Sequence, residues 1–157
     1  MALILGTEYC KMDSSGRFKL PNALKKQLET TDCRFVVRHG FTNECLELWT
    51  YDSFQNEVAR LRKELNPYRI QDQQILRQLT RANIIEMDNS DRLMIPPERK
   101  SLLGDAKELV LQSTGECIEI WERNAYDKMN NEIIDLASIV DNRLGAKHEL
   151  SSTSDAE

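Results

Sequence analysis

The chain repeats itself, and this repeat constrains the fold more than any other feature of the sequence. Residues 12–21 read MDSSGRFKLP and residues 87–96 read MDNSDRLMIP, an offset of 75. Further matches join residues 35–38 to 109–112 and residues 45–49 to 117–121, at offsets of 74 and 72. The order is kept while the offset shrinks, so the second copy has lost a few loop residues. The 157 residues therefore consist mainly of two copies of one unit of about 70 residues.

Each copy predicts the same first elements: an extended segment that ends in Met-Asp, a polar turn and a short second strand. In that strand polar and apolar residues alternate, which is the pattern of a strand with one buried face. The outward residues are Arg17, Lys19, Arg92 and Met94, and the inward ones are Phe18, Leu20, Leu93 and Ile95. Pro21 and Pro96 then mark the start of a short helix, because proline is favoured at or near the first helical position.

A hairpin and a longer amphipathic helix complete each copy. The expected hairpins join the matched segments around residues 35–49 and 109–121, and the expected helices cover residues 54–65 and 126–140. After a break at Asn66-Pro67, residues 72–82 predict a further helix with Ile75, Leu76 and Leu79 on one face. Gly104 is expected to cap the second short helix. We interpret all these apolar stripes as core.

The repeat indicates an α+β protein with a simple domain order. The expected segments are a first repeat at residues 1–65, a connecting helix at 66–83, a second repeat at 84–144 and a polar tail at 145–157 that is expected to be disordered. A chain of this length buries roughly two thirds of its surface, as one compact domain or as two halves that share a core.

Charge is divided unevenly between the copies. Over the whole chain 21 Lys and Arg stand against 26 Asp and Glu, a net charge of −5 that by itself argues against a nucleic-acid partner. Residues 1–81, however, hold 13 cations and 10 anions, a net of +3, whereas residues 82–157 hold 8 and 16, a net of −8. Such asymmetry indicates that the first repeat is basic and faces an anionic partner, while the second is acidic.

The turn from Asp13 to Arg17 is the most informative segment. The Asp13 carboxylate is expected to accept hydrogen bonds from the turn backbone, and Gly16 to take a positive φ or to let another backbone come close. Arg17, followed by Lys19 on the same side, can present a guanidinium to phosphate or to a guanine edge. An alternative stays open, in which Asp13 and Arg17 merely hydrogen-bond each other across a hairpin turn.

The second copy departs from this pattern at two positions. Asp91 stands in the place of Gly16, and Met94 stands in the place of Lys19. Aspartate tolerates left-handed backbone moderately well, so the turn can keep its shape while its surface loses a cation and gains an anion. We therefore favour a structural role for the second turn.

An Asp, a short turn, Gly-Arg and a strand ending in Pro, present twice about 75 residues apart, resemble the MraZ family. Further similarities are Gly6-Thr7-Glu8-Tyr9, Arg38-His39-Gly40-Phe41, Asn66-Pro67-Tyr68 and the two strands that read Leu/Ile-Glu-Leu/Ile-Trp. The resemblance covers residues 1 to about 135.

This resemblance implies a bacterial transcriptional regulator of the division and cell-wall gene cluster. It implies an AbrB-like swapped-hairpin fold, in which the two pseudo-symmetric repeats form one β-barrel with flanking helices. It also implies a closed-ring homo-oligomer that binds direct repeats in double-stranded promoter DNA, mainly as a repressor, in the cytoplasm and on the nucleoid. Carried over to this chain, the DNA-binding residues are Arg17, Lys19, Gly16 and Arg92 with help from Lys11 and Lys25, while Asp13, Asp88, Pro21 and Pro96 shape the motifs.

Other classes of protein are less well supported. The alternative is an oligomeric interaction scaffold, whose basic turn contacts an acidic protein instead of DNA. An enzyme is not expected, because Ser14 and Ser15 have no obvious base and His39 has no flanking acid. The four cysteines are too far apart for a zinc site or a disulfide framework. No metal, cofactor, small-molecule substrate or membrane span is expected, since no apolar run approaches about 18 residues.

Overall fold

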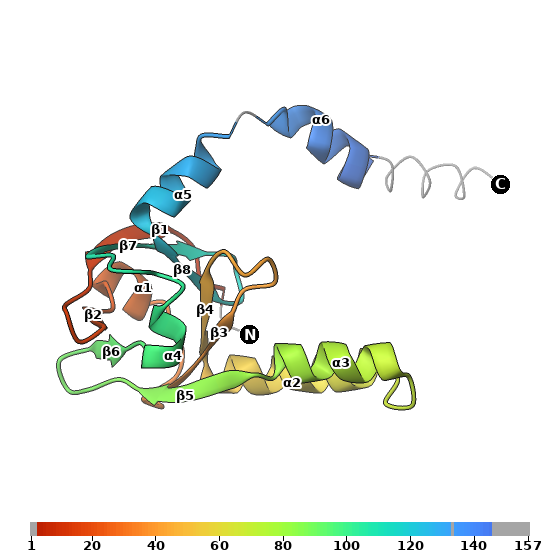
Figure 1. Ribbon diagram of the computed structural model, residues 1–157, viewed down its shortest axis with the longest axis horizontal. Coiled ribbons are helices and arrows are strands. Elements are labelled where there is room, and N and C mark those ends of the chain that lie inside the picture. Colours follow the sequence, from red (N-terminus) through yellow and green to blue (C-terminus); the bar gives the residue numbers. More distant parts are fainter. Residues whose placement is uncertain (1–2, 133, 146–157) are drawn as a thin grey trace. The chain divides into compact units, whose positions relative to one another are not determined.

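The computed structural model describes residues 3–132 and 134–145. Contacts divide the chain into two units, Met1–Asp127 and Lys128–Glu157. The first unit holds both predicted repeats up to the start of the last helices, and Figure 1 shows its strands gathered at one end with two longer helices leaving them.

The first unit is α+β and its sheets are antiparallel. The strands of the larger sheet are β1 (Thr7–Lys11), β3 (Arg34–His39), β4 (Leu46–Thr50), β5 (Ala82–Glu86), β7 (Glu108–Ser113) and β8 (Ile118–Glu122). Their order is β1-β7-β8-β4-β3-β5, and a separate two-stranded sheet pairs β2 (Arg17–Lys19) with β6 (Arg92–Met94). The predicted second strands and both hairpins are confirmed.

The two copies exchange strands within this arrangement. β1 of the first copy pairs with β7 of the second, β5 of the second pairs with β3 of the first, and β4 meets β8 at the centre. The counterparts in the two copies are β1 and β5, β3 and β7, and β4 and β8. When each strand of the larger sheet is replaced by its counterpart, the result is the same order read in reverse. The copies therefore share one sheet about a pseudo-two-fold axis.

The expected closed barrel is wrong for the residues that the structure describes. The edge strands β1 and β5 each pair with one neighbour only, so the larger sheet is open. The physical reason is that each copy leaves its edge strand through a tight turn and places its next strand in the two-stranded sheet. That small sheet covers the core instead of closing the large one.

The short helices begin where the prolines predict. Helix α1 (Asn22–Lys25) follows Pro21, and helix α4 (Pro97–Lys100) follows Pro96. Both proline carbonyls accept the first backbone hydrogen bonds of their helix, at 2.9–3.0 Å. Gly104 has a φ of +62°, yet it lies in a turn beyond the C-cap Ser101, so the predicted capping role is wrong.

The core lies between the large sheet and the cover made by β2, β6, α1 and α4. Phe18 and Leu93, from the middle of the two short strands, are 1% and 0% exposed. They pack with Leu24 of α1 and with sheet residues of both hairpins. The predicted inward faces Phe18, Leu20, Leu93 and Ile95 are all confirmed as buried.

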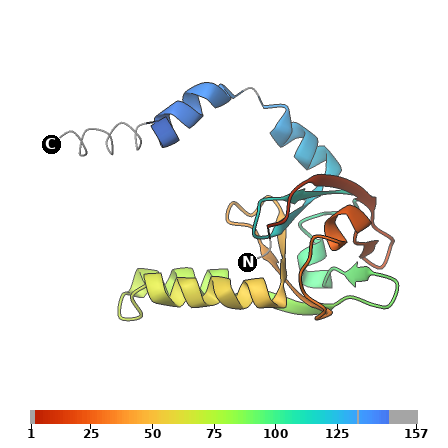
Figure 2. The ribbon, with the colours of Figure 1, turned by 180° about the vertical axis from the view of Figure 1, so that it is seen from behind.

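Two longer helices extend from the sheet, as Figure 1 and Figure 2 show. Helix α2 (Tyr51–Glu64) is capped by the Thr50 hydroxyl, which accepts a hydrogen bond from the Ser53 N–H at 3.2 Å. Helix α3 (Ile70–Leu79) buries none of its residues, so the interpretation of its stripe as core is wrong. The predicted helix also ran too far, because the residues from Ala82 pair with β3 as strand β5.

The last helices do not form the single helix that the apolar stripe over residues 126–140 predicts. Helix α5 (Arg123–Asn130) ends early, and helix α6 (Leu136–Val140) and a π-helical turn η1 (Asp141–Gly145) follow. The Asp135 side chain restarts the helix by accepting a hydrogen bond from the Ser138 N–H at 3.2 Å. Ile133 and residues 146–157 of the expected tail lie outside the described residues. None of the described helices is long and apolar enough to cross a membrane.

Candidate nucleic-acid interface

The Asp13 carboxylate organises the first turn. Its Oδ1 accepts hydrogen bonds from the backbone N–H groups of Ser15 and Arg17, each at 2.9 Å. The Arg17 N–H is the main cause that holds the pKa of Asp13 below its usual range, and the Ser15 N–H and the charges of Arg17 and Arg92 add to it. Gly16 has a φ of +87°, and a Cβ there would lie 3.3 Å from the Ile95 carbonyl oxygen. Both sequence-based expectations for this turn are confirmed.

The second turn keeps this backbone although an aspartate replaces the glycine. Asp88 Oδ1 accepts hydrogen bonds from the N–H groups of Ser90 at 2.8 Å and Arg92 at 3.0 Å. The Arg92 N–H in turn is the main cause that lowers the pKa of Asp88. Asp91 has a φ of +61°, a left-handed conformation that aspartate tolerates better than most residues. The prediction that the turn survives the substitution is confirmed.

The two turns lie beside each other, because β2 and β6 pair antiparallel. The pairing continues into the turns themselves. The Gly16 carbonyl accepts a hydrogen bond from the Ile95 N–H at 2.9 Å, and the Asp91 carbonyl accepts one from the Leu20 N–H at 2.9 Å. The motifs of the two copies therefore form one surface.

One exposed face of this pair of strands carries cations from both copies. The register places Lys19 opposite Arg92 and Arg17 opposite Met94, and all four side chains are exposed. We call these four residues the ribbon face. Like charges directly opposite each other destabilise a sheet. Among the residues that the structure describes, no carboxylate forms an ion pair with Arg17, Lys19 or Arg92.

The contact between Asp13 and Arg17 uses the backbone of Arg17. Asp13 Oδ1 accepts its hydrogen bond from the backbone N–H of Arg17, and the guanidinium acts on Asp13 only through its charge. The same holds for Asp88 and Arg92. The carboxylates shape the turns, and the cations at their ends face outward, where an external anion can reach them.

Lysines from the neighbouring helices reach across to the turns. Lys25 Nζ of α1 lies 2.6 Å from Asp91 Oδ1, so it is bound within the protein rather than free for an external anion. Its counterpart Lys100 on α4 donates to the Ser14 carbonyl at 2.8 Å. Lys11 is exposed at the end of β1. Sequence reasoning missed Lys100, although the offset of 75 from Lys25 points to it.

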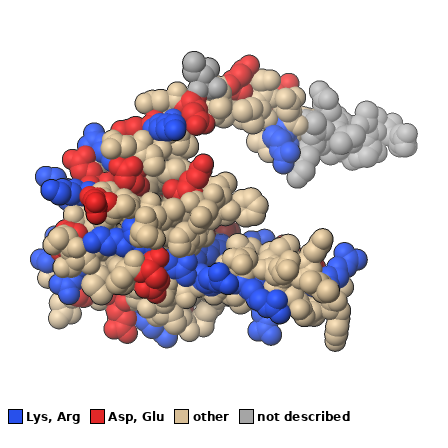
Figure 3. Space-filling model, in the orientation of Figure 1, with Lys and Arg blue, Asp and Glu red and all other residues tan. Residues whose placement is uncertain are grey.

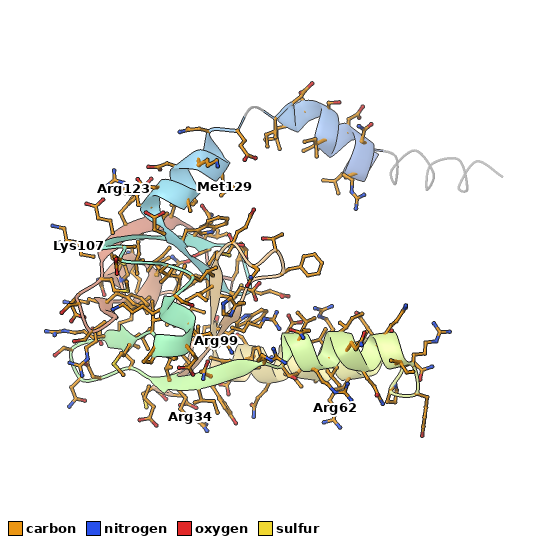
Figure 4. All side chains as sticks on the ribbon, viewed as in Figure 1. Arg34, Arg62, Arg99, Lys107, Arg123 and Met129 are labelled. Atoms are coloured by element: carbon orange, nitrogen blue, oxygen red, sulfur yellow. The ribbon has the colours of Figure 1, made fainter. Side chains whose placement is uncertain are left out.

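A second group of Lys and Arg side chains lies on the two long helices of the first unit. Lys and Arg side chains follow α2 and α3, as Figure 3 shows. Arg62 is an exposed member of this group, and Figure 4 shows it on α2. The same figure places Arg99 by α4, where it is buried and donates to Asn83 Oδ1 at 2.7 Å and to the Arg81 carbonyl at 2.7 Å.

His39, Cys10 and Cys117, whose residue types are often used in catalysis, lie in contacts that do not activate them. His39 meets the Arg99 guanidinium through Nδ1, and burial together with the charge of Arg99 lowers its pKa. All four cysteines are free thiols. Burial raises the pKa of Cys10 and Cys117 to about 12, which disfavours the thiolate that nucleophilic attack or metal binding needs. Within the described ranges, no group of His, Cys, Asp and Glu is placed to hold a metal ion.

The fold and the paired turns define a two-repeat α+β protein with a cationic face on its two-stranded sheet, and comparison with known proteins gives its family. A family model described as "MraZ protein, putative antitoxin-like" matches residues 3–77 and 79–145. These two stretches correspond to the two copies of the repeat. The chain belongs to the MraZ family.

Several relatives are similar over nearly their whole length. A protein of Flavobacterium psychrophilum named "Transcriptional regulator MraZ" is 33% identical over 148 residues, which cover 92% of this chain and 94% of that protein. A protein of the same name from Christiangramia forsetii is 30% identical over 148 residues, covering 92% and 95%. One from Mycoplasmoides gallisepticum is 28% identical over 135 residues, covering 85% and 91%.

Proposed function

We propose that this chain is a transcriptional regulator that binds double-stranded promoter DNA through the ribbon face. The names of its relatives support a regulator. The observation that carries the proposal is the like-charged pair of Lys19 and Arg92, which face each other with no carboxylate paired to either among the described residues. An external polyanion removes their repulsion, and the phosphates of DNA supply that charge at regular spacing.

The geometry suits contact without chemistry. A two-stranded ribbon fits the major groove of DNA, and Asp13 and Asp88 hold both turns in a fixed shape before any partner arrives. In this proposal Arg17, at the end of the first turn, contacts a phosphate or the O6 and N7 atoms of guanine. In this proposal the first repeat supplies most of the DNA contacts. The exchange of strands between copies is then the swapped-hairpin arrangement of AbrB-type proteins, made within one chain.

We further propose that copies of the chain assemble into a ring and bind direct repeats upstream of the division and cell-wall gene cluster, mainly to repress it, on the nucleoid in the cytoplasm. Each ribbon face is small, so several copies acting together raise the affinity through effective concentration when the repeats match their spacing. Exposed apolar side chains at Phe41, Tyr68 and Ile70, which are 90%, 94% and 75% exposed, support a contact between copies.

A mobility-shift assay tests the DNA-binding function. A duplex of about 60 base pairs from upstream of the protein's own reading frame is the probe, and its binding should weaken with salt at a slope of roughly −5 if three copies contact two phosphates each. Arg17→Ala should abolish the shift and leave the thermal unfolding transition in place. Arg62→Ala, which removes an exposed arginine from α2, is the matched control and should still bind. If no protein shifts the probe at low salt, the interaction scaffold becomes the better account.

A further inference from the structure

The turns of the two copies have the same backbone hydrogen bonds, but only the second carries a carboxylate at its fourth residue. Gly16 and Asp91 are counterparts, with φ of +87° and +61°. Asp91 therefore adds a carboxylate to a turn whose shape does not require it. That carboxylate directly precedes Arg92 in the chain, and its Oδ1 binds Lys25 Nζ of α1 at 2.6 Å.

The two lysines that reach the turns end in different chemical states. Lys100 donates to the neutral carbonyl of Ser14, so its positive charge stays uncompensated by that contact. Lys25 meets the anionic Asp91, and the pair carries no net charge. The side chains of Lys25 and Asp91 are 41% and 33% exposed, so an external phosphate can approach the pair but meets an anion there.

The strands repeat this difference. On β2 both outward residues are cations, whereas on β6 Met94 takes the place of Lys19 and leaves Arg92 alone. The first-copy half of the surface thus presents Arg17, Lys19 and Lys100. The second-copy half presents Arg92, together with a lysine that is already neutralised. A nearly two-fold backbone carries a charge pattern with no two-fold symmetry.

We propose that the Asp91–Lys25 ion pair gives DNA binding by the ribbon face a single orientation. The first-copy half then contacts the phosphates, and the second-copy half contacts them much less. This inference rests on the proposed DNA-binding function and adds a specificity-determining residue to it. A symmetric pair of reading elements favours a palindromic site. A face with most of its uncompensated cations on the first-copy strand instead binds an asymmetric site in one orientation, because reversal would place Met94 where Lys19 contacts a phosphate and Asp91 where Gly16 lies.

A double-mutant cycle tests the ion pair directly. Asp91→Asn keeps a residue that tolerates positive φ and removes the charge, so Lys25 becomes free. We expect Asp91→Asn to bind the upstream duplex about tenfold more tightly at 0.1 M salt, with a salt slope steeper by about 1, the effect of one added phosphate contact. Lys25→Gln alone should leave the slope unchanged, and Lys25→Gln combined with Asp91→Asn should lose the gain.

The same measurements can overturn the proposal. If the salt slope of Lys25→Gln is less steep than that of the wild type by about 1, Lys25 already contacts a phosphate in the wild type. The ion pair with Asp91 then does not keep Lys25 from DNA. If Asp91→Asn leaves the salt slope unchanged, the Asp91 carboxylate is not what keeps Lys25 from contacting a phosphate. Thermal unfolding of each variant shows that the fold is intact.

Ethylation interference on the same duplex tests the direction of binding. The wild-type protein should show one cluster of sensitive phosphates on one side of each site, and Asp91→Asn combined with Met94→Lys should add a second, symmetry-related cluster. Two equal clusters with the wild-type protein would contradict the proposal while leaving DNA binding in place. If neither protein shifts the duplex at low salt, the DNA-binding function fails and the single orientation fails with it.

Discussion

Lys19 of β2 stands directly opposite Arg92 of β6, and both side chains are exposed on the same face of a two-stranded sheet. Opposite residues in such a sheet lie about 5 Å apart at Cβ, where like charges repel. Local choices that oppose stability are expected at functional sites. Lys19 therefore lowers the stability of the protein through its repulsion with Arg92 while, in the proposed function, it raises the affinity for DNA.

Replacing Lys19 by glutamine should change the stability and the DNA affinity in opposite directions. Lys19→Gln removes the repulsion with Arg92, so the free energy of unfolding should rise by roughly 0.2–1 kcal/mol, while the affinity for the upstream duplex should fall. Urea denaturation at low salt measures the first effect and the mobility shift measures the second. Lys63→Gln, an exposed lysine on α2, is the control and should leave the stability within about 0.5 kcal/mol. A loss of stability in Lys19→Gln would show that the lysine has a partner that stabilises it.

Much of the site could be predicted because its signals are local. Alternation within residues 17–20 gives the buried and exposed sides of β2, and the Asp and Gly of the first turn determine a shape that needs only neighbouring backbone. The repeat then transfers both to the second copy. These predictions hold because a turn and a two-residue period depend on few distant contacts.

The rest depends on pairings between distant parts of the chain. Nothing in the sequence of β1 says that it pairs with β7 rather than within its own copy, or that the next strand joins β6 in a separate sheet and leaves β1 at an edge. Lys25 meets Asp91 only because β2 and β6 come together. The apolar stripe of α3 has the period of a core helix, yet a period states which face is apolar and not what covers it.

Two glycines with positive φ allow the close packing of the first turn to be tested. Gly16→Ala places a Cβ 3.3 Å from the Ile95 carbonyl oxygen, whereas a Cβ on Gly104 meets nothing within 4 Å. Both substitutions force alanine into left-handed backbone at about 1–2 kcal/mol. We therefore expect Gly16→Ala to reduce the free energy of unfolding more than Gly104→Ala and to weaken DNA binding, which Gly104→Ala should leave intact. Equal losses of stability would mean that β6 can move away from the first turn.

A buried arginine connects the sheet to both long helices. Arg38 of β3 donates to Glu47 at 2.8 Å, to Glu57 of α2 at 2.8 Å and to the Leu79 carbonyl at the end of α3 at 2.8 Å. The side chains of Arg38 and Glu57 are 6% and 7% exposed. Arg60 also pairs with Glu57, through Oε1. Removal of Arg38 therefore takes the donor from Glu57 Oε2 only, so the cost should lie at the lower end of the roughly 3–5 kcal/mol that breaking a buried ion pair costs.

Arg38→Gln should therefore reduce the free energy of unfolding by about 3 kcal/mol, measured by urea denaturation. The second copy supplies a matched rescue, because Gln112 and Met129 stand where the first copy has Arg38 and Glu57. Arg38→Gln combined with Glu57→Met should recover most of the loss, since the buried carboxylate whose Oε2 lost its donor is then absent. If the double variant is no more stable than Arg38→Gln, the arginine acts through its bonds to Glu47 and the Leu79 carbonyl and not through Glu57.

His39 and Arg99 form a contact that ties stability to pH. Arg99 of α4 is buried, and its guanidinium meets Nδ1 of His39 on β3 while it donates to Asn83 and to the Arg81 carbonyl. Burial and then the charge of Arg99 lower the pKa of His39. The neutral imidazole is therefore the form that fits the folded protein, since a protonated ring would place two cations in contact.

Acidification should destabilise the protein as His39 begins to take up a proton. With its pKa lowered on folding, the unfolded chain binds more protons between the ordinary histidine value of about 6.5 and the lower folded value. Stability from this residue is fully present above the first and is lost as the pH falls through this interval. His39→Asn keeps an acceptor near the Nδ1 position and does not titrate, so its melting temperature should fall less between pH 7.5 and 5.5 than that of the wild type. An unchanged pH dependence in His39→Asn would show that other groups, and not this contact, control stability in that range.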